Sequence, residues 1–138
     1  MYGEEGDRLR ALSYYNRDVY LLCFSIAQGR YNYEYDKIRN KWSLEVAHAR
    51  RPIEPLIVVV GMRAEARYAE EPSENYITIE EGIMIAKAVG AAGYIECSME
   101  TGQGVLEVCR EAALLWCNQG QKELKKGKKK GDKRCEIQ

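Results

Sequence analysis

The stretch Leu56–Arg67, LIVVVGMRAEAR, joins a run of aliphatic residues to charged residues directly behind it. Continuous apolar runs of this length are typical of strands buried on both faces of a parallel sheet. Such sheets bind ligands beyond the carboxyl ends of their strands, which is where Arg63 and Glu65 stand in this chain. The two side chains could therefore hold a polar ligand. The alternative is that both are solvated loop charges.

The C-terminal residues are a candidate site for covalent modification. Cys135 is followed by Glu136, Ile137 and Gln138, a Cys-a-a-X pattern whose final glutamine is typical of farnesylation. A single lipid chain binds a membrane only marginally, but each nearby basic residue adds about 1 kcal/mol at an anionic surface. The residues that we expect to bind the membrane in this way are Lys125, Lys126, Lys128, Lys129, Lys130, Lys133 and Arg134. The alternatives are a disordered solubilising tail or a nuclear-import signal.

Cysteine and histidine usage argues against a metal centre. The five cysteines show no CxxC pairing and the chain has one histidine, His48, so neither a zinc site nor a disulfide framework is expected. Reduced thiols in a cytosolic protein fit this pattern. No window approaches the length of about 18 apolar residues that crosses a membrane, and the acidic start MYGEEG is unlike a signal peptide.

The charge distribution divides the chain into two parts. Its 138 residues, 46% hydrophobic and 30% charged, suit one compact domain. Residues 1–121 carry 13 basic and 18 acidic side chains, whereas residues 122–138 carry 8 basic and 3 acidic ones. We therefore predict a domain over 1–121 and a polybasic tail over 122–138. Charge alone would suit a membrane or nucleic acid; the cysteine motif favours the membrane, and no nucleic-acid partner is expected.

The elements that must position these residues alternate between helix and strand. Helices are predicted over Glu4–Tyr15, Tyr31–Ala49, Thr78–Gly90 and Val105–Gln121, and strands over Asp18–Ser25, Leu56–Val60 and Tyr94–Cys97. Thr78 and Glu81 can form a capping box, and Tyr68–Tyr76 is expected to be a loop. This order predicts an α/β fold in which right-handed crossovers wind a parallel sheet with helices on both faces.

Several of these segments together resemble the Rho/Rac branch of the small GTPases. They are DRLRALSY, DVYLLCFS, NKWSLEVAHA, PLIVVVG, AKAVGAAGYIECS and TGQGV, and the Cys-a-a-X ending completes the pattern. The resemblance extends over roughly 6–138. It implies a P-loop NTPase-like fold with about three strands left, GTP or GDP and Mg²⁺ as cofactors, and a signalling switch of the cytoskeletal type at membranes.

Other motifs of that family do not occur in the sequence. The phosphate-binding loop, GxxxxGK followed by Ser or Thr, is absent, as are the switch threonine and the DTAGQ segment that orients the attacking water. The chain thus resembles a Rho protein without its N-terminal third. We expect it to be defective in nucleotide binding and hydrolysis, and we assign no catalytic residue.

The resemblance assigns the guanine end of the site to four residues. Met62, Arg63, Ala64 and Glu65 stand where the family has Asn/Thr-Lys-x-Asp, whose lysine packs on guanine and whose aspartate accepts two hydrogen bonds from the base. Ser98-Met99 replaces the Ser-Ala pair that contacts the base through a backbone N–H. The candidate base-binding residues are therefore Arg63, Glu65, Ser98 and Met99, a degenerate form of the family's set.

Partner surfaces follow from the same resemblance. Arg8, Leu9 and Tyr14 match the switch II helix, which in the family contacts exchange factors and the dissociation inhibitor, although a core role for Leu9 is an alternative. In the family the strand matching 18–25 lies in the sheet centre beside a strand that this sequence lacks. We expect it to be an exposed edge that can pair with another chain.

Three functions remain open at this point. The chain could be a guanine-nucleotide switch by descent, or a non-catalytic prenylated module that acts as a decoy for Rho regulators. It could also be a truncated gene product.

Overall fold

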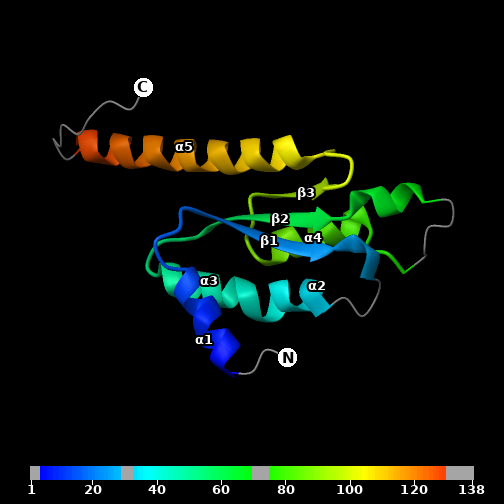
Figure 1. Cartoon of the computed structure of the whole chain (residues 1–138). Coiled ribbons are helices and arrows are strands. Elements are labelled where there is room, and N and C mark those ends of the chain that lie inside the picture. Colours follow the sequence, from blue (N-terminus) through cyan, green and yellow to red (C-terminus); the bar gives the residue numbers. More distant parts are fainter. Residues whose placement is uncertain (1–3, 29–32, 70–74, 130–138) are drawn as a thin grey trace.

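The computed structural model describes residues 4–28, 33–69 and 75–129. Its sheet contains three parallel strands in the order β1-β2-β3, formed by Val19–Ser25, Leu56–Met62 and Gly93–Cys97 (Figure 1). Leu21 pairs with Val58, and Val58 with Gly93, so the three strands begin at one end of the sheet. The expected α/β fold with a parallel sheet is confirmed.

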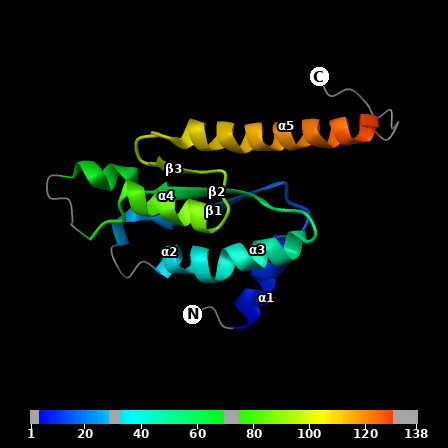
Figure 2. The ribbon, with the colours of Figure 1, turned by 180° about the vertical axis from the view of Figure 1, so that it is seen from behind.

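Helices cover both faces of the sheet, as Figures 1 and 2 show from opposite sides. On one face, α4 (Ile79–Ala88) packs against Phe24, Ile57 and Val59. The helical segment formed by α2 (Tyr33–Lys37), η2 (Ile38–Trp42) and α3 (Ser43–Arg50) packs on the same face. On the other face, α5 (Val105–Lys129) packs through Val108 on a second apolar cluster, which also contains Val58, Val60 and Cys97. Strand β2 is buried from both sides because it is the central strand, which explains its uninterrupted aliphatic sequence.

The helix expected over residues 31–49 is a continuous helical run with a π-helical turn inside it. The run consists of α2 (Tyr33–Lys37), the π-helical turn η2 (Ile38–Trp42) and α3 (Ser43–Arg50). Ile38 and Val46 are fully buried, so this run packs on the sheet through one apolar face.

The ends of α4 follow the sequence signals. The Thr78 hydroxyl accepts from Glu81 N at 3.1 Å and the Glu81 carboxylate accepts from Thr78 N at 3.2 Å, so the predicted capping box is present. Gly90, with φ of +73°, follows the helix where a left-handed residue is needed.

Helix α5 continues further than the sequence pattern predicted. It ends at Lys129 instead of Gln121, because the Lys, Glu and Leu residues that follow Gln121 are good helix formers. The helix therefore crosses the predicted boundary between residues 121 and 122, and the division into domain and tail stays a prediction.

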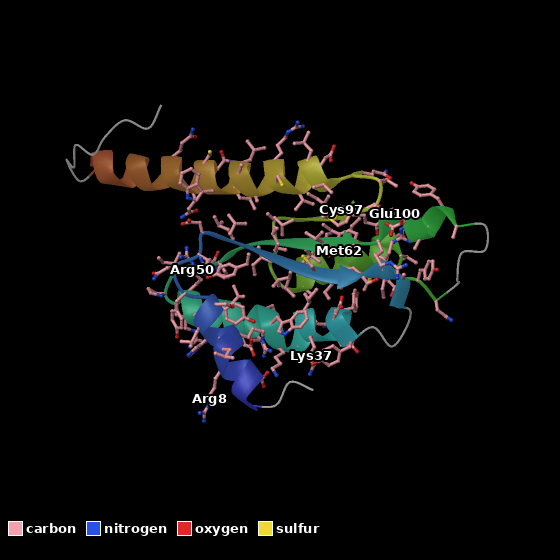
Figure 3. All side chains as sticks on the ribbon, in the orientation of Figure 1. Arg8, Lys37, Arg50, Met62, Cys97 and Glu100 are labelled. Atoms are coloured by element: carbon pink, nitrogen blue, oxygen red, sulfur yellow. The ribbon has the colours of Figure 1, made fainter. Side chains whose placement is uncertain are left out.

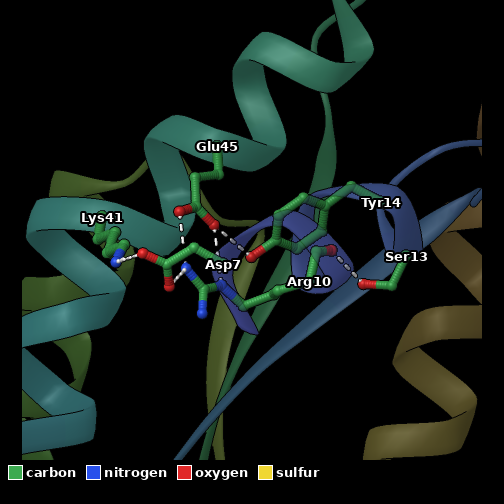
Figure 4. Close-up of polar contacts among 6 residues, drawn as sticks. All are labelled: Asp7, Arg10, Ser13, Tyr14, Lys41 and Glu45. Carbon is green, nitrogen blue, oxygen red and sulfur yellow. Dashed lines mark hydrogen bonds and ion pairs between the residues drawn. The ribbon is translucent and has the colours of Figure 1, made fainter. Parts of the chain in front are cut away.

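Helix α1 (Glu4–Ser13) is attached to η2 and α3 by a polar network (Figure 4). Arg10 donates to both carboxylate oxygens of Glu45, at 3.0 and 2.9 Å, and the Tyr14 hydroxyl donates to Glu45 at 2.7 Å. Asp7 accepts from Arg10 at 2.8 Å and from Lys41 at 2.9 Å. The Arg10 hydrogen bonds are the main reason that the pKa of Glu45 lies below its ordinary value.

The Tyr94 ring occupies a narrow space between β2 and α4 that only glycine allows. A Cβ added at Gly61 would lie 2.2 Å from the Tyr94 hydroxyl oxygen, and one at Gly82 would lie 2.2 Å from ring carbons. The ring stacks on Phe24 with centroids 6.0 Å apart. Two glycines in different elements thus define the position of one aromatic side chain.

Candidate functional site

The candidate site lies beyond the carboxyl ends of β2 and β3. Met62 is the last residue of β2, and Arg63 follows with φ of 64° and ψ of 43° before the short 3₁₀ helix η3 (Ala64–Tyr68). A left-handed conformation is unfavourable for a residue with a Cβ by about 1–2 kcal/mol. It turns the chain sharply here, and the Arg63 side chain is 64% exposed.

Glu65 is the charged centre of this edge. Its Oε1 lies 3.8 Å from Arg63 Nε, and its side chain is 23% exposed. The pKa of Glu65 lies below its ordinary value, mainly through hydrogen bonding with the Ser98 hydroxyl and its own backbone N–H, with a smaller effect of the Arg63 charge. Its second oxygen, Oε2, is buried and has no hydrogen-bond partner within the described part of the chain.

Ser98 is held in place by the loop that leads into α5. It is fully buried; its N–H donates to Gln103 O at 2.8 Å, and its hydroxyl accepts from Thr101 N at 3.1 Å. Gly104 closes this loop against β3, since a Cβ there would lie 2.2 Å from Glu96 O. Met99 follows with 71% of its surface exposed. The structure thus brings Arg63, Glu65 and Ser98 together and leaves the Met99 side chain on the surface.

A supporting ion pair behind the site was missed by sequence reasoning. Arg67 Nε donates to Glu96 Oε1 at 2.7 Å, Arg67 also donates to Ile77 O at 2.5 Å, and the Tyr94 hydroxyl donates to Glu96 at 2.6 Å. These bonds attach η3 to β3 and so fix the segment that carries Glu65. The only signal in the sequence was an arginine two residues after Glu65 and a glutamate two residues before Ser98.

No cluster of metal-ligating side chains is found at this edge among the residues that the structure describes. The described residues contain no group of three or more His, Cys, Asp or Glu side chains that could hold a metal ion. A cleft of about 490 Å³ lies elsewhere, lined by residues of α1, α2 and η2: Gly6, Arg10, Tyr33, Glu34 and Trp42. Within the described part of the chain, the candidate site is built around the partly buried carboxylate of Glu65, with the Arg67–Glu96 ion pair behind it.

Comparison with known proteins identifies the fold and the family. The sequence-based family model described as "Ras family" matches residues 3–116 of the chain. The chain belongs to the Ras family.

Its relatives within that family are Rho-type small GTPases. The chain is 34% identical to GTP-binding protein RHO1 of Candida albicans over 91% of its own length and 64% of that protein's length. It is 38% identical to GTP-binding protein rho5 of Schizosaccharomyces pombe, over 80% and 56% of the two lengths. It is 43% identical to Rho-related protein racE of Dictyostelium discoideum, over 76% and 47%. The chain thus spans about half to two-thirds of the length of these relatives.

The residues matched to the family's switch II helix differ in accessibility. Arg8 is exposed and Leu9 is 66% exposed, so the alternative that Leu9 belongs to the core is wrong. Tyr14, in contrast, is 8% exposed, with its ring against Tyr20 and its hydroxyl on Glu45. Tyr14 therefore packs in the core and presents no surface to a partner, because Tyr20 and Glu45 cover it.

The Cys-a-a-X box and part of the basic segment lie outside the described residues. These are Lys130, Lys133, Arg134 and Cys135. Lys125, Lys126, Lys128 and Lys129 belong to α5, of which only the backbone is described there. Within the described residues, no helix combines the length and apolar character needed to cross a membrane.

Proposed function

We propose that the chain is a Rho-type signalling homologue that keeps the guanine end of the family's nucleotide site. On its own, the chain of 138 residues binds guanine nucleotides weakly and does not hydrolyse GTP. The observation that carries the proposal is Glu65, a carboxylate with a lowered pKa and one buried oxygen without a partner in the described region, at the edge where the family binds the base.

The residues of this edge suit a flat ligand with N–H donors. In the family, GTP or GDP supplies the base and the phosphates, with Mg²⁺ on the latter. Here the Glu65 carboxylate would accept N–H donors of the base, and the exposed Arg63 side chain can lie over its ring. Hydrogen bonding with the Ser98 hydroxyl lowers the pKa of this carboxylate and so favours its charged form. No described residue is assigned to the phosphates or the metal.

The free energies involved explain why binding of the base at this edge is expected to be weak. Two or three hydrogen bonds to the base contribute about 0.5–3 kcal/mol each. Association costs about 4–15 kcal/mol in lost translational and rotational freedom. A chain without the phosphate-binding loop therefore has a dissociation constant well above the micromolar range.

The first test is a titration of the 138-residue chain with labelled GDP and Mg²⁺, where micromolar or tighter binding would contradict the proposal. The second is an NMR titration with guanosine at millimolar concentration. Shifts confined to the amides around Arg63, Glu65 and Ser98 are expected, and they should vanish in Glu65→Gln but persist in the control Glu80→Gln. Shifts that persist in Glu65→Gln would exclude Glu65 as the base acceptor.

We further propose that the chain acts at the cytoplasmic face of membranes, through a prenyl group on Cys135 and the basic residues around it. Family membership supports this, since attachment of Rho proteins to membranes is general in the family. Expressed in cells, the wild-type chain should fractionate with membranes and Cys135→Ser should not. Membrane retention of Cys135→Ser would refute the lipid anchor.

Regulators of Rho proteins are the proposed protein partners, with Arg8 and Leu9 on α1 as the accessible part of the contact surface. A chain that binds an exchange factor or the dissociation inhibitor without cycling nucleotide would act as a decoy. Competition of the purified chain with a full-length Rho protein for an inhibitor tests this, and Leu9→Glu should abolish the competition. Unchanged competition by Leu9→Glu would place the contact elsewhere.

We also propose self-association through β1. In the described region β1 pairs only with β2, and Leu21 on this edge strand is 45% exposed. An unpaired apolar edge favours pairing with a second copy. Sedimentation should show a concentration-dependent dimer that Leu21→Lys converts to a monomer. A wild-type chain that stays monomeric at high concentration would rule this out.

A further inference from the structure

Basic residues from separate elements meet at the amino ends of the strands. Arg17 lies two residues before β1, Arg50 and Arg51 end the helical run that leads into β2, and Lys87 is in the last turn of α4. Because the strands are parallel, their amino ends lie at one edge of the sheet, and α4 runs back to that edge. Figure 3 shows Arg50 there, at the opposite end of the molecule from Glu100.

The charges of two of these guanidinium groups act on one buried phenol, that of Tyr20. The charges of Arg50 and Arg17 both act to lower the pKa of Tyr20, against the larger effect of burial that raises it. Arg17 Nε donates to Ser13 O at 3.1 Å, and the buried Arg50 Nε has no hydrogen-bond partner among the described residues. No ion pair in the described part of the chain involves Arg17, Arg50 or Arg51.

The acidic residues at this edge are fewer than the basic ones. Only Asp18 and Glu54 belong to the segments that directly precede β1 and β2, and neither forms an ion pair within the described region. Beside them, Ile53 leaves half of its surface exposed. The edge therefore presents an excess of positive charge together with an exposed aliphatic side chain.

Helix α5 brings further basic residues to the same side. It starts near the carboxyl end of β3 and runs back across the sheet, so its C-terminal half extends past the amino ends of the strands (Figures 1 and 2). Its last turns contain Lys122, Lys125, Lys126 and Lys129, whose i, i+3, i+4, i+7 spacing belongs to one helix face.

The opposite end of the sheet carries acidic residues. This edge also carries the basic residues Arg63 and Arg67. The acidic residues that lie beyond the carboxyl ends of the strands or in the first turns of the adjacent helices outnumber them: Glu34, Asp36, Glu65, Glu80, Glu81, Glu100 and Glu107. The formal net charge of the chain is zero, so an attraction to anionic surfaces depends on this separation of charge and not on an overall excess.

We propose that the strand amino-end surface, formed by Arg17, Arg50, Arg51, Ile53 and Lys87, is a second membrane-binding surface that docks on anionic phospholipid together with the end of α5. Guanidinium groups that form no ion pair can bind phosphate oxygens, and an exposed aliphatic residue among them suits the lipid interface better than the polar groove of a nucleic acid. Docking in this way points the Glu65 edge away from the bilayer. The inference does not require the prenyl group.

The test uses the unprenylated 138-residue chain and two kinds of vesicle, phosphatidylcholine with and without phosphatidylserine. Each basic residue at an anionic surface contributes about a fivefold change in affinity, so Arg17→Gln/Arg50→Gln/Arg51→Gln should bind the anionic vesicles about 100-fold more weakly. The matched control is Arg8→Gln/Arg39→Gln/Arg110→Gln, which removes the same charge from exposed positions of α1, η2 and α5. It should lose less than about fivefold, since those positions lie outside the strand amino-end surface.

Further variants separate folding from binding. Circular dichroism reports whether the triple variant folds. If it does not fold, the double variant Arg17→Gln/Arg51→Gln takes its place, with Arg8→Gln/Arg110→Gln as the matched control. This comparison leaves Arg50 unchanged. An equal loss in test and control variants would overturn the proposal, as would tighter binding to a single-stranded RNA than to the anionic vesicles. Because no lipid modification or nucleotide is present, failure here leaves the proposals on Cys135 and Glu65 untouched.

Discussion

Glu45→Gln gives the sharpest test of how α1 is held on the domain. The carboxylate accepts two hydrogen bonds from Arg10 and one from Tyr14, and both ion-pair partners are about one-quarter exposed, at 25% for Glu45 and 26% for Arg10. Hydrogen bonds to a charged group contribute about 1.5–3 kcal/mol when buried, whereas exposed ion pairs contribute about 0–1 kcal/mol. After allowing for this exposure, we expect a loss of about 2 kcal/mol.

The same variant makes a prediction about pH. The pKa of Glu45 is lowered from its ordinary value of 4.5, mainly by the Arg10 hydrogen bonds and further by that of Tyr14. A depressed pKa in the folded state stabilises the protein fully above the ordinary pKa and loses this effect as the pH falls through the folded pKa. The difference between wild type and Glu45→Gln should therefore be largest near about pH 7 and shrink at about pH 3.

Urea denaturation measures this difference, with a loss of about 2 kcal/mol lowering the midpoint by roughly 1 M. Hydrogen exchange should show faster opening of the α1 amides in particular. Glu54→Gln, at an exposed loop position, is the control and should stay within about 0.5 kcal/mol of wild type. A loss below about 0.5 kcal/mol in Glu45→Gln, or one that is the same at both pH values, would refute the argument.

Three further predictions concern the stability effects of single substitutions. Gly82→Ala should lower the free energy of unfolding, measured by urea denaturation, by about 1–3 kcal/mol, because the new Cβ would overlap the Tyr94 ring. Gly93→Ala is the control: nothing lies within 4 Å of its Cβ, and it should lower the free energy of unfolding by less than about 1 kcal/mol. Thr78→Ala removes the capping hydroxyl of α4 and should cost about 1 kcal/mol by thermal unfolding; an unchanged transition would show that the cap is not needed. Arg63→Gly should stabilise the chain by up to about 1 kcal/mol by relieving the left-handed conformation, while weakening the guanosine-induced NMR shifts.

The fold could be predicted because its signals are local. An aliphatic run, an amphipathic period and a Thr-x-x-Glu cap each lie within one segment, and segments of opposite type must alternate in a parallel sheet. The predicted end of α5 at Gln121 is wrong, because a lysine-rich segment is compatible with a tail and with a helix alike, and here the helix continues to Lys129.

What could not be predicted depends on contacts between distant segments. Tyr14 has the sequence context of a surface residue, but Glu45, its hydrogen-bond partner, lies 31 residues further along the chain. The hydrogen bond from Arg67 to Glu96 likewise joins residues that are 29 positions apart in the sequence. No period or spacing within either segment specifies these pairs.

The candidate site was partly accessible to sequence analysis. Residues that follow adjacent parallel strands lie at one edge, and this places Arg63, Glu65 and Ser98 near one another. The left-handed backbone of Arg63 and the buried Glu65 oxygen could not be foreseen, because both depend on how η3 packs against β3.

The narrow space around Tyr94 has a consequence for sequence change. The ring touches the positions of two glycines, so a side chain at residue 61 or 82 can be accommodated only if residue 94 becomes smaller. A smaller residue at 94 would in turn leave a cavity next to Phe24 and release the hydrogen bond to Glu96. Substitutions at 61, 82 and 94 should therefore be accepted together during divergence and rarely one at a time.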